Sequence, residues 1–202
     1  MFMLYSILIG LLVGLLAGGR VSWLAELRLR WMTPAVAAML VQTALFTPPV
    51  WTAVGDLAPV IYVSSTLVVL LVVLRNLQRA WALTLVALGT VSNLLAIVAN
   101  GGYMPVTAEA LGIGAPTVTR YGGNSMLTAN PSLAPLVDRF ALPDWLPLAT
   151  VYSVGDVLIG IGVVLVIVIA MRPPRPVRDV RGPRRSRGLG VQPDPDGGMP
   201  TT

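Results

Sequence analysis

The segment 151-VYSVGDVLIGIGVVLVIVIAM-171 is an apolar run rich in Val, Leu and Ile, with a single acidic residue, Asp156, near its start. A bilayer core about 30 Å thick is crossed by about 20 apolar residues, because an α-helix rises about 1.5 Å per residue. The segment is therefore predicted to be a transmembrane helix, and it sets the class of fold that we expect for the whole chain.

Four more segments upstream have the same character, at about residues 2–18, 32–46, 57–74 and 81–99. The segment 32–46 is the shortest of these, and its alternative interpretation is half of a hairpin or a segment in the membrane interface. We predict an all-α fold, a polytopic membrane helix bundle with five transmembrane helices, over residues 1–171. One long extracytoplasmic loop, residues 100–150, joins the last two spans.

Composition supports a membrane protein and excludes most catalytic classes. The 202 residues are 55% hydrophobic and 11% charged, against about 25% charged in an ordinary soluble domain. The chain has no cysteine, no histidine and no lysine, so thiolate, imidazole and Schiff-base chemistry are excluded. We therefore expect no catalytic residue, no metal site and no cofactor, and a protein that is not an enzyme.

The arginines predict the orientation of the spans, because cytoplasmic loops carry an excess of positive charge. With the N-terminus outside and the C-terminus cytoplasmic, 12 of the 14 arginines lie inside, in residues 20–31, 75–79 and 172–202. Only Arg120 and Arg139 then lie outside. A cleaved signal peptide is the alternative for residues 1–19, but positive charge follows that apolar run and none precedes it, the reverse of a secretory signal.

The tail, residues 172–202, is rich in arginine and proline and has no apolar run, so we predict a disordered cytoplasmic segment. Its arginines favour binding to anionic lipid. Nucleic acid is not the expected partner, because the segment lacks the interleaved aromatic residues on which bases stack.

Small residues recur at four-residue intervals in the first span, at Ser6, Gly10, Gly14 and Gly18. Such a stripe allows the backbone of another helix to approach closely. We favour another span of the same chain as the neighbour, with a second membrane protein as the alternative partner.

Polar residues inside a membrane are costly, and each is a functional candidate. By helical rise, these residues fall toward the outer leaflet: Gln42, Ser64, Ser65, Asn93, Asn100 and Asp156. One hypothesis is an outward-facing polar pocket with Asp156 as its charge or proton carrier. The other, which we favour, is that these side chains form interhelical hydrogen bonds and that Asp156 reaches interfacial water or pairs with Arg120 or Arg139.

The loop 100–150 is rich in glycine and proline and is predicted to contain many turns, with short helices at 108–111 and 132–140. Asp138 and Glu109 are further acids in this region, but nothing in their spacing brings them to Asp156.

Two motifs resemble a known family. They are NGGYMPV at 100–106 and YSVGDVLI at 152–159, together with Gly123-Asn124-Ser125 in the loop. Over residues 1–171 the chain resembles the domain of unknown function 5317 family, which implies a small bacterial inner-membrane protein and no particular activity. On this resemblance the loop candidates are Gly101, Gly102, Tyr103, Met104, Pro105, Asn124 and Ser125.

We therefore expect a multi-pass protein of the bacterial plasma membrane that is a non-enzymatic binding, assembly or accessory component. The alternative is a transporter of a small molecule, an ion or a lipid that uses a polar pocket around Asp156. No internal repeat of the kind common in transporters is present, which favours the first expectation.

Overall fold

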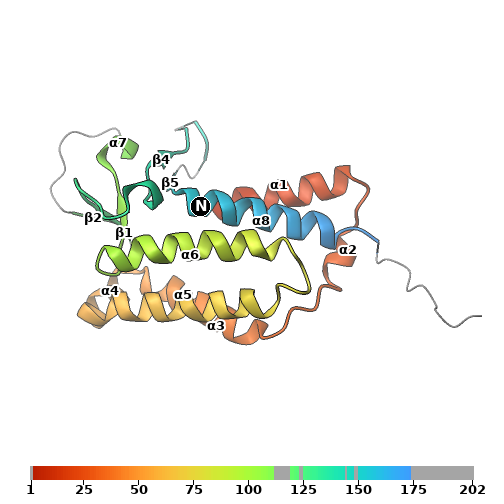
Figure 1. Ribbon diagram of the computed structural model, residues 1–202, viewed down its shortest axis with the longest axis horizontal. Coiled ribbons are helices and arrows are strands. Elements are labelled where there is room, and N and C mark those ends of the chain that lie inside the picture. Colours follow the sequence, from red (N-terminus) through yellow and green to blue (C-terminus); the bar gives the residue numbers. More distant parts are fainter. Residues whose placement is uncertain (1, 112–118, 123–124, 144, 148–149, 174–202) are drawn as a thin grey trace, which may run out of the picture.

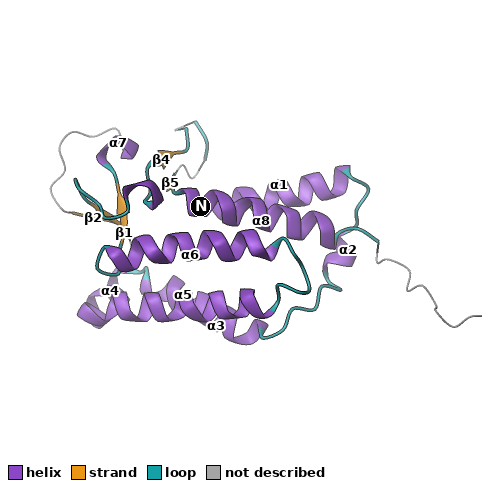
Figure 2. Cartoon of the chain, viewed as in Figure 1, coloured by secondary structure: helices purple, strands orange, loops and turns teal. Residues whose placement is uncertain are grey.

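The computed structural model describes residues 2–111, 119–122, 125–143, 145–147 and 150–173. The described part is mostly helical, and one main helix lies in each of the five apolar segments (Figures 1 and 2). These helices are α1 (Phe2–Leu16), α3 (Met32–Leu45), α5 (Ala58–Arg75), α6 (Leu83–Ala99) and α8 (Val154–Ala170). Asn124 and the tail from residue 174 lie outside the described residues.

The helices lie side by side in the order α1, α8, α6, α5, α3, so α8 is held between α1 and α6 (Figure 1). The short helix α2 (Val21–Leu24) follows α1 at one end of the bundle. At the other end, α4 (Pro48–Val54) and the 3-10 turn η1 (Gly55–Leu57) lead directly into α5. Proline suits these starts, because the first turn of a helix leaves its backbone N–H groups unpaired anyway.

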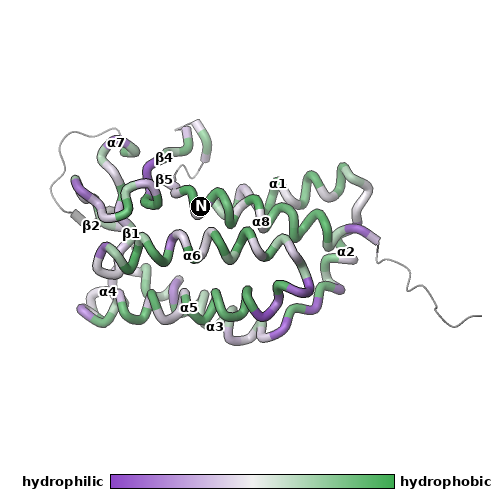
Figure 3. Tube along the Cα trace, in the orientation of Figure 1, coloured by the Kyte–Doolittle hydropathy of each residue, from purple (hydrophilic) through white to green (hydrophobic). Residues whose placement is uncertain are grey.

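Within the described residues, one helical stretch is long and apolar enough to cross a membrane, judged by length and composition alone: Pro48–Arg75, 28 residues. The other four main helices, α1, α3, α6 and α8, are apolar but shorter. Long apolar side chains are exposed along the bundle. In Figure 3 the helices are coloured mainly as hydrophobic. Examples from four helices are Leu12, Leu40, Leu71 and Leu95, each more than half exposed.

The region between α6 and α8 folds into a small cap on one end of the bundle, which we define as residues 100–153 in their described part (Figure 1). It contains β1 (Met104–Val106), α7 (Ala108–Leu111), β2 (Thr119–Gly122), β3 (Ser125–Leu127), η2 (Ala134–Leu136), β4 (Phe140–Ala141) and β5 (Val151–Tyr152). In one sheet β3 lies between β1, which is parallel to it, and β2, which is antiparallel. The second sheet pairs β4 with β5.

The all-α prediction is therefore wrong for the cap, because glycine and proline break helices there and the freed backbone groups pair as short strands. The predicted helix at 108–111 is confirmed as α7. The predicted helix at 132–140 is wrong: Leu133 takes a left-handed conformation with φ 54°, and only one 3-10 turn follows before β4.

The cap has a hydrophobic core that continues into the bundle. Met104 and Val137 of the cap pack against Ala96 and Ile97 of α6, and Tyr62 and Val63 of α5 border this cluster. Burial of these apolar side chains joins the cap to two helices, so the cap is part of the same folded unit.

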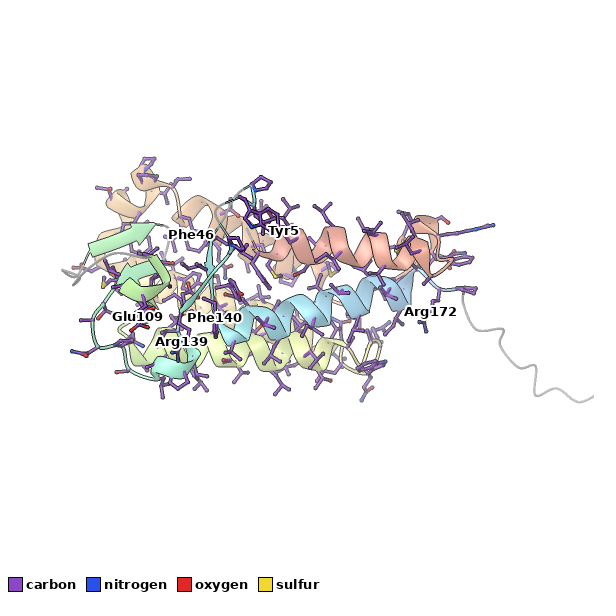
Figure 4. All side chains as sticks on the ribbon, turned by 90° about the horizontal axis from the view of Figure 1, so that it is seen from above. Tyr5, Phe46, Glu109, Arg139, Phe140 and Arg172 are labelled. Atoms are coloured by element: carbon purple, nitrogen blue, oxygen red, sulfur yellow. The ribbon has the colours of Figure 1, made fainter. Side chains whose placement is uncertain are left out.

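Aromatic contacts fix the cap to α1 and α4 as well. Phe2 stacks on Tyr152 with ring centroids 4.9 Å apart, and Trp51 contacts Tyr103 at 5.8 Å. The Tyr5 hydroxyl donates a hydrogen bond to the Pro147 carbonyl oxygen, and Figure 4 shows Tyr5 on α1 near the cap.

The end opposite the cap holds the connections α1–α3 and α5–α6 and the end of α8. Asn76, 1% exposed, clamps these connections together. Its side-chain carbonyl accepts a hydrogen bond from the Arg30 N–H at 2.7 Å, and its amide donates to the Arg30 carbonyl at 2.9 Å. The Arg20 N–H donates to the Met171 carbonyl at 2.9 Å, which ties the end of α8 to the same region.

Candidate functional site

Asp156 begins helix α8 as part of a capping box. Ser153 is the N-cap residue, and its hydroxyl accepts a hydrogen bond from the Asp156 N–H at 3.0 Å. In return, one carboxylate oxygen of Asp156 accepts from the Ser153 N–H at 3.0 Å. This exchange satisfies backbone donors that the first turn of a helix leaves unpaired, and it places a negative charge at the positive end of the helix dipole.

Asn93 of α6 completes this group of side chains. Its amide donates to the other carboxylate oxygen of Asp156 at 2.8 Å, and its carbonyl oxygen accepts from the Ser153 hydroxyl, also at 2.8 Å. Asn93 thus forms hydrogen bonds with both residues of the capping box and fixes the start of α8 to the side of α6. We call Asn93, Ser153 and Asp156 the α6–α8 junction.

Two glycines allow the junction to form. A Cβ on Gly155 would lie 1.9 Å from the Asn93 side-chain oxygen, and a Cβ on Gly89 would lie 2.3 Å from the Gly155 carbonyl. Both distances are far below van der Waals contact, so any side chain at either position would push the helices apart. The close approach of α6 and α8 is what brings Asn93 within hydrogen-bond distance of Asp156.

Asp138 is a second acid beside the junction. It is 7% exposed, and its Oδ1 has no hydrogen-bond partner within the described part of the chain. Its backbone N–H donates to the Pro105 carbonyl at 3.0 Å, which holds it next to β1. Burial raises the pKa of the Asp138 carboxyl to about 7, and the charge of Asp156 adds to this effect.

Asn100 links the end of α6 to the cap. Its side-chain amide donates to the Ala96 carbonyl at 2.7 Å and to the Ser132 carbonyl at 2.9 Å. Its side-chain oxygen accepts from the Ser132 N–H at 2.8 Å. Asn100 therefore ends the helix and holds the loop, and it makes no contact with Asp156 among these hydrogen bonds.

The NGGYMPV motif forms the turn and strand that follow. Gly101 and Gly102 have φ angles of 74° and 89°, which L side chains rarely adopt, and a Cβ on Gly102 would lie 2.4 Å from Pro59. Tyr103 contacts Trp51, while Met104 and Pro105 are buried in β1. Ser125 pairs with Met104 across the parallel strands β1 and β3.

The remaining polar candidates lie between other helices. The Gln42 amide of α3 donates to the hydroxyls of Ser65 and Thr66 on α5, both at 3.1 Å. Ser64, the neighbour of Ser65, is exposed and borders a shallow hollow of about 300 Å³ with Gly101 and Gly102. The structure thus places the six pocket candidates in separate groups and brings together only Asn93 with Asp156 and Gln42 with Ser65.

The small-residue stripe of α1 lies against α8. Ser6, Gly10 and Gly14 are buried. A Cβ on Gly10 would lie 3.1 Å from Ile167, and one on Gly14 would lie 2.4 Å from the Met171 sulfur. Gly18 does not belong to this contact surface: α1 ends at Leu16, Gly18 has a φ of 78°, and a Cβ there would meet nothing within 4 Å.

Among the described side chains no ion pair holds Asp156, so the alternative of a pair with Arg139 is not found. Within the described side chains, Asp156 is bonded to Asn93 and Ser153, while Arg139 is exposed and its guanidinium lies 5.9 Å from the Phe140 ring. Figure 4 shows Arg139 and Phe140 at the cap end. The side chain of Arg120 is outside the described part.

The sequence pattern does not point to Thr66, includes Ser153 only within the YSVGDVLI motif and gives Asp138 no role. One signal was present: Ser153-Val154-Gly155-Asp156 before an apolar run is the pattern of a capping box. Asp138 carries no comparable local pattern, because it reaches the junction only through the fold of the cap.

The described residues define a mostly helical bundle with a small strand-containing cap that is hydrogen-bonded to α1, α6 and α8. A model described as a family of unknown function (DUF5317) matches residues 25–168, which is more than half of the chain. The chain therefore belongs to this family, as its two motifs predict, although the match begins after α1. Comparison with curated proteins and with solved structures finds no match.

Proposed function

We propose that this chain is a five-span protein of the bacterial plasma membrane that acts by binding, as an assembly or accessory component, and that its cap is the part presented outside. The family description assigns no activity, so the proposal rests on the geometry of the chain.

The exposed apolar side chains along all five main helices support the membrane part of this proposal. Soluble monomers rarely expose continuous apolar surface of more than a few hundred Å². The arginines of the described chain also divide by end. Two lie in the cap, at Arg120 and Arg139, and six lie at or beyond the opposite ends of the helices: Arg20, Arg28, Arg30, Arg75, Arg79 and Arg172. This division favours N-terminus outside and C-terminus cytoplasmic.

Introduced cysteines test the orientation without interference, because the chain has none of its own. The two cysteine variants are Glu109→Cys, in the cap, and Arg172→Cys, at the end of α8. Both positions are exposed. We expect a membrane-impermeant maleimide to label the first in intact cells and the second only after the membrane is opened. The reverse pattern would overturn the proposed orientation.

The observation that carries the binding role is that five of the six polar candidates, all except Ser64, are hydrogen-bonded to other residues of the described chain. Asn93 is bonded to Ser153 and Asp156, Asn100 to Ser132, and Gln42 to Ser65 and Thr66. A transport path needs polar groups that a substrate can reach, whereas these groups fasten helices and cap to one another. The exposed apolar residues of the cap, Leu133, Phe140 and Trp145, offer a surface to a partner.

A photo-crosslinking residue at Trp145, which is 78% exposed, tests this role in the native membrane. The matched control is Leu16, which is 79% exposed and lies at the end of α1 farther from the cap. We expect one defined protein adduct from the cap position and none from Leu16. Equal adducts from both positions, or lipid adducts alone from both, would contradict a partner-binding cap.

A transporter is the second candidate, and Asp138 is the observation that favours it. A buried carboxyl with an unpaired oxygen, next to the charge of Asp156, is a group that can take up and release a proton. Purified chain in sealed vesicles would show proton uptake coupled to a solute, and Asp138→Asn would abolish it while the folded protein remained. Absence of such uptake would leave the binding role as the better account.

A further inference from the structure

The end of the bundle opposite the cap contains a hollow of about 650 Å³. Its walls come from three places: α2 with the turn that follows it, the residues just before α6, and the end of α8 with the residues after it. Trp23 and Glu26 lie on the first wall, Trp81 on the second and Arg172 on the third. Figure 4 shows Arg172 at this end of the molecule.

Opposite charges lie across the hollow without neutralising each other. Glu26 and Arg172 are both exposed, and no salt bridge within 4.0 Å joins any carboxylate and guanidinium among the described side chains. A second guanidinium is adjacent: Arg20 lies 5.5 Å from the Trp23 ring, and its backbone is tied to Met171, the residue before Arg172. The hollow thus offers the Arg172 guanidinium at the end of α8 and the Glu26 carboxylate on the turn after α2, with the Arg20 guanidinium next to Trp23.

Trp81 offers a ring to an organic cation at a membrane interface, whereas the Trp23 ring already contacts the Arg20 guanidinium. Trp81 is 62% exposed and Trp23 is half-buried, and both line the hollow. Tryptophan is enriched at the headgroup level of membranes, and its ring attracts ammonium groups. Below them, Leu27 and Ile169 give the hollow an apolar side.

We propose that this hollow binds the headgroup of a zwitterionic phospholipid that carries a phosphate and an ammonium group. Arg172 takes the phosphate, and Glu26 with the Trp81 ring takes the ammonium group, while the acyl chains leave over Leu27 and Ile169. The inference rests on the proposed membrane orientation, which puts this end of the bundle at the level of the inner headgroups.

Charge complementarity selects this occupant over two others. A purely anionic headgroup would place negative charge near Glu26 with no ammonium group to offset it. The segment 174–202 carries six arginines against three aspartates, so it would satisfy Glu26 but bring an excess of positive charge toward Arg172. A ligand whose two opposite charges balance and are separated by a short linker matches both Arg172 and Glu26.

Native mass spectrometry of the full chain, released from mixed-lipid nanodiscs, tests the proposal. The probes are phosphatidylethanolamine and phosphatidylglycerol of the same acyl chains. We expect one retained phosphatidylethanolamine, preferred about ten-fold, and a loss of about ten-fold in retention for Glu26→Gln and for Arg172→Gln, about what one charge-assisted hydrogen bond supplies. Arg75→Gln, the same change at an exposed arginine outside the hollow, should leave retention unchanged.

Equal retention of the two lipids by the unaltered chain, or equal loss in Arg75→Gln and Arg172→Gln, would overturn the proposal. So would increased retention after removal of residues 178–202, since the tail would then be the occupant. A chain recovered outside the membrane fraction would instead defeat the proposed function itself. A membrane-inserted chain with no lipid preference would defeat only the headgroup site.

Discussion

Asn93 and Asp156 are 63 residues apart in the sequence and are joined by a hydrogen bond of 2.8 Å from the Asn93 amide to the Asp156 carboxylate. The same carboxylate closes the capping box with Ser153, so one side chain both starts α8 and fastens it to α6. The role this gives to Asp156 is a joint between two helices at the base of the cap.

Replacement of Asp156 should therefore lower stability. Asp156→Ala removes the partner of the Asn93 amide and of the Ser153 N–H, and we expect a loss of about 2–4 kcal/mol in the free energy of unfolding. Asp156→Asn keeps an oxygen acceptor and should lose less. The measurement is denaturant-induced unfolding in detergent, with proteolysis of the cap as a local readout.

Glu109→Gln is the matched control, because Glu109 is an exposed acid in the same cap. If Asp156→Asn kept full stability and an unchanged cap but lost a transport activity, Asp156 would be a functional charge and not a structural one.

The close approach of α6 and α8 predicts that Gly155→Ala strongly lowers the stability of the fold. Its Cβ would fall 1.9 Å from the Asn93 oxygen, so either the hydrogen bonds of the junction break or α6 and α8 separate. We expect a loss of at least about 3 kcal/mol or a failure to fold, seen as reduced thermal stability in detergent. Ala99→Ser, at an exposed position on α6, should change stability little, and comparable losses in both variants would contradict the packing argument.

The raised pKa of Asp138 predicts that the free energy of unfolding depends on pH. Its pKa is raised from 3.8 in an unstructured chain to about 7 in the folded protein, first by burial and then by the charge of Asp156. The folded state therefore binds the proton more tightly than the unfolded state, and this contribution is full below about pH 3.8 and is lost as pH rises to about 7.

Measured unfolding free energies should show this decline over pH 4–7, by an amount on the order of 4 kcal/mol at most. Asp138→Asn, which is neutral at every pH, should flatten that part of the curve. A decline that persists unchanged in the variant would assign the dependence to another group.

Replacement of Asn76 should loosen the connections between helices at the end opposite the cap. Asn76→Ala leaves the Arg30 N–H and carbonyl without their side-chain partner, at a cost of about 1–3 kcal/mol. A cysteine placed at Leu29, in a chain with no other cysteine, should then react faster with a maleimide. The control is Gln78→Ala, because Gln78 is exposed and lies two residues after Asn76. It should leave the rate of the maleimide reaction unchanged.

The positions of the main helices were predictable from sequence because an apolar run of sufficient length has few alternatives to a helix. The predicted segment 81–99 holds α6 at Leu83–Ala99, and 151–171 holds α8 at Val154–Ala170. The capped start of α8 accounts for its boundary, since Ser153 supplies a short side chain whose hydroxyl accepts from the Asp156 N–H. The spans themselves and their orientation stay predictions.

The arrangement of the cap was not predictable, because its pairings join residues that are distant in the chain. The parallel pairing of Met104 with Ser125 and the approach of Asp138 to the junction depend on burial of Val137 against α6. Asn93 and Asp156 were candidates by residue type alone. Their direct contact required the glycine surfaces of two helices, which periodicity does not reveal.

The position of α8 between α1 and α6 has a consequence for biosynthesis. The small-residue surfaces of α1 and α6 are made before α8, the helix that covers them, because α8 follows both of them in the chain. During translation these surfaces, together with the Asn93 amide, lack their cover, and a nascent chain at that stage has no closed bundle. Completion of the fold therefore waits for residues 153–171, so a chaperone or insertase that shields α1 and α6 in the interval would determine the yield of folded protein.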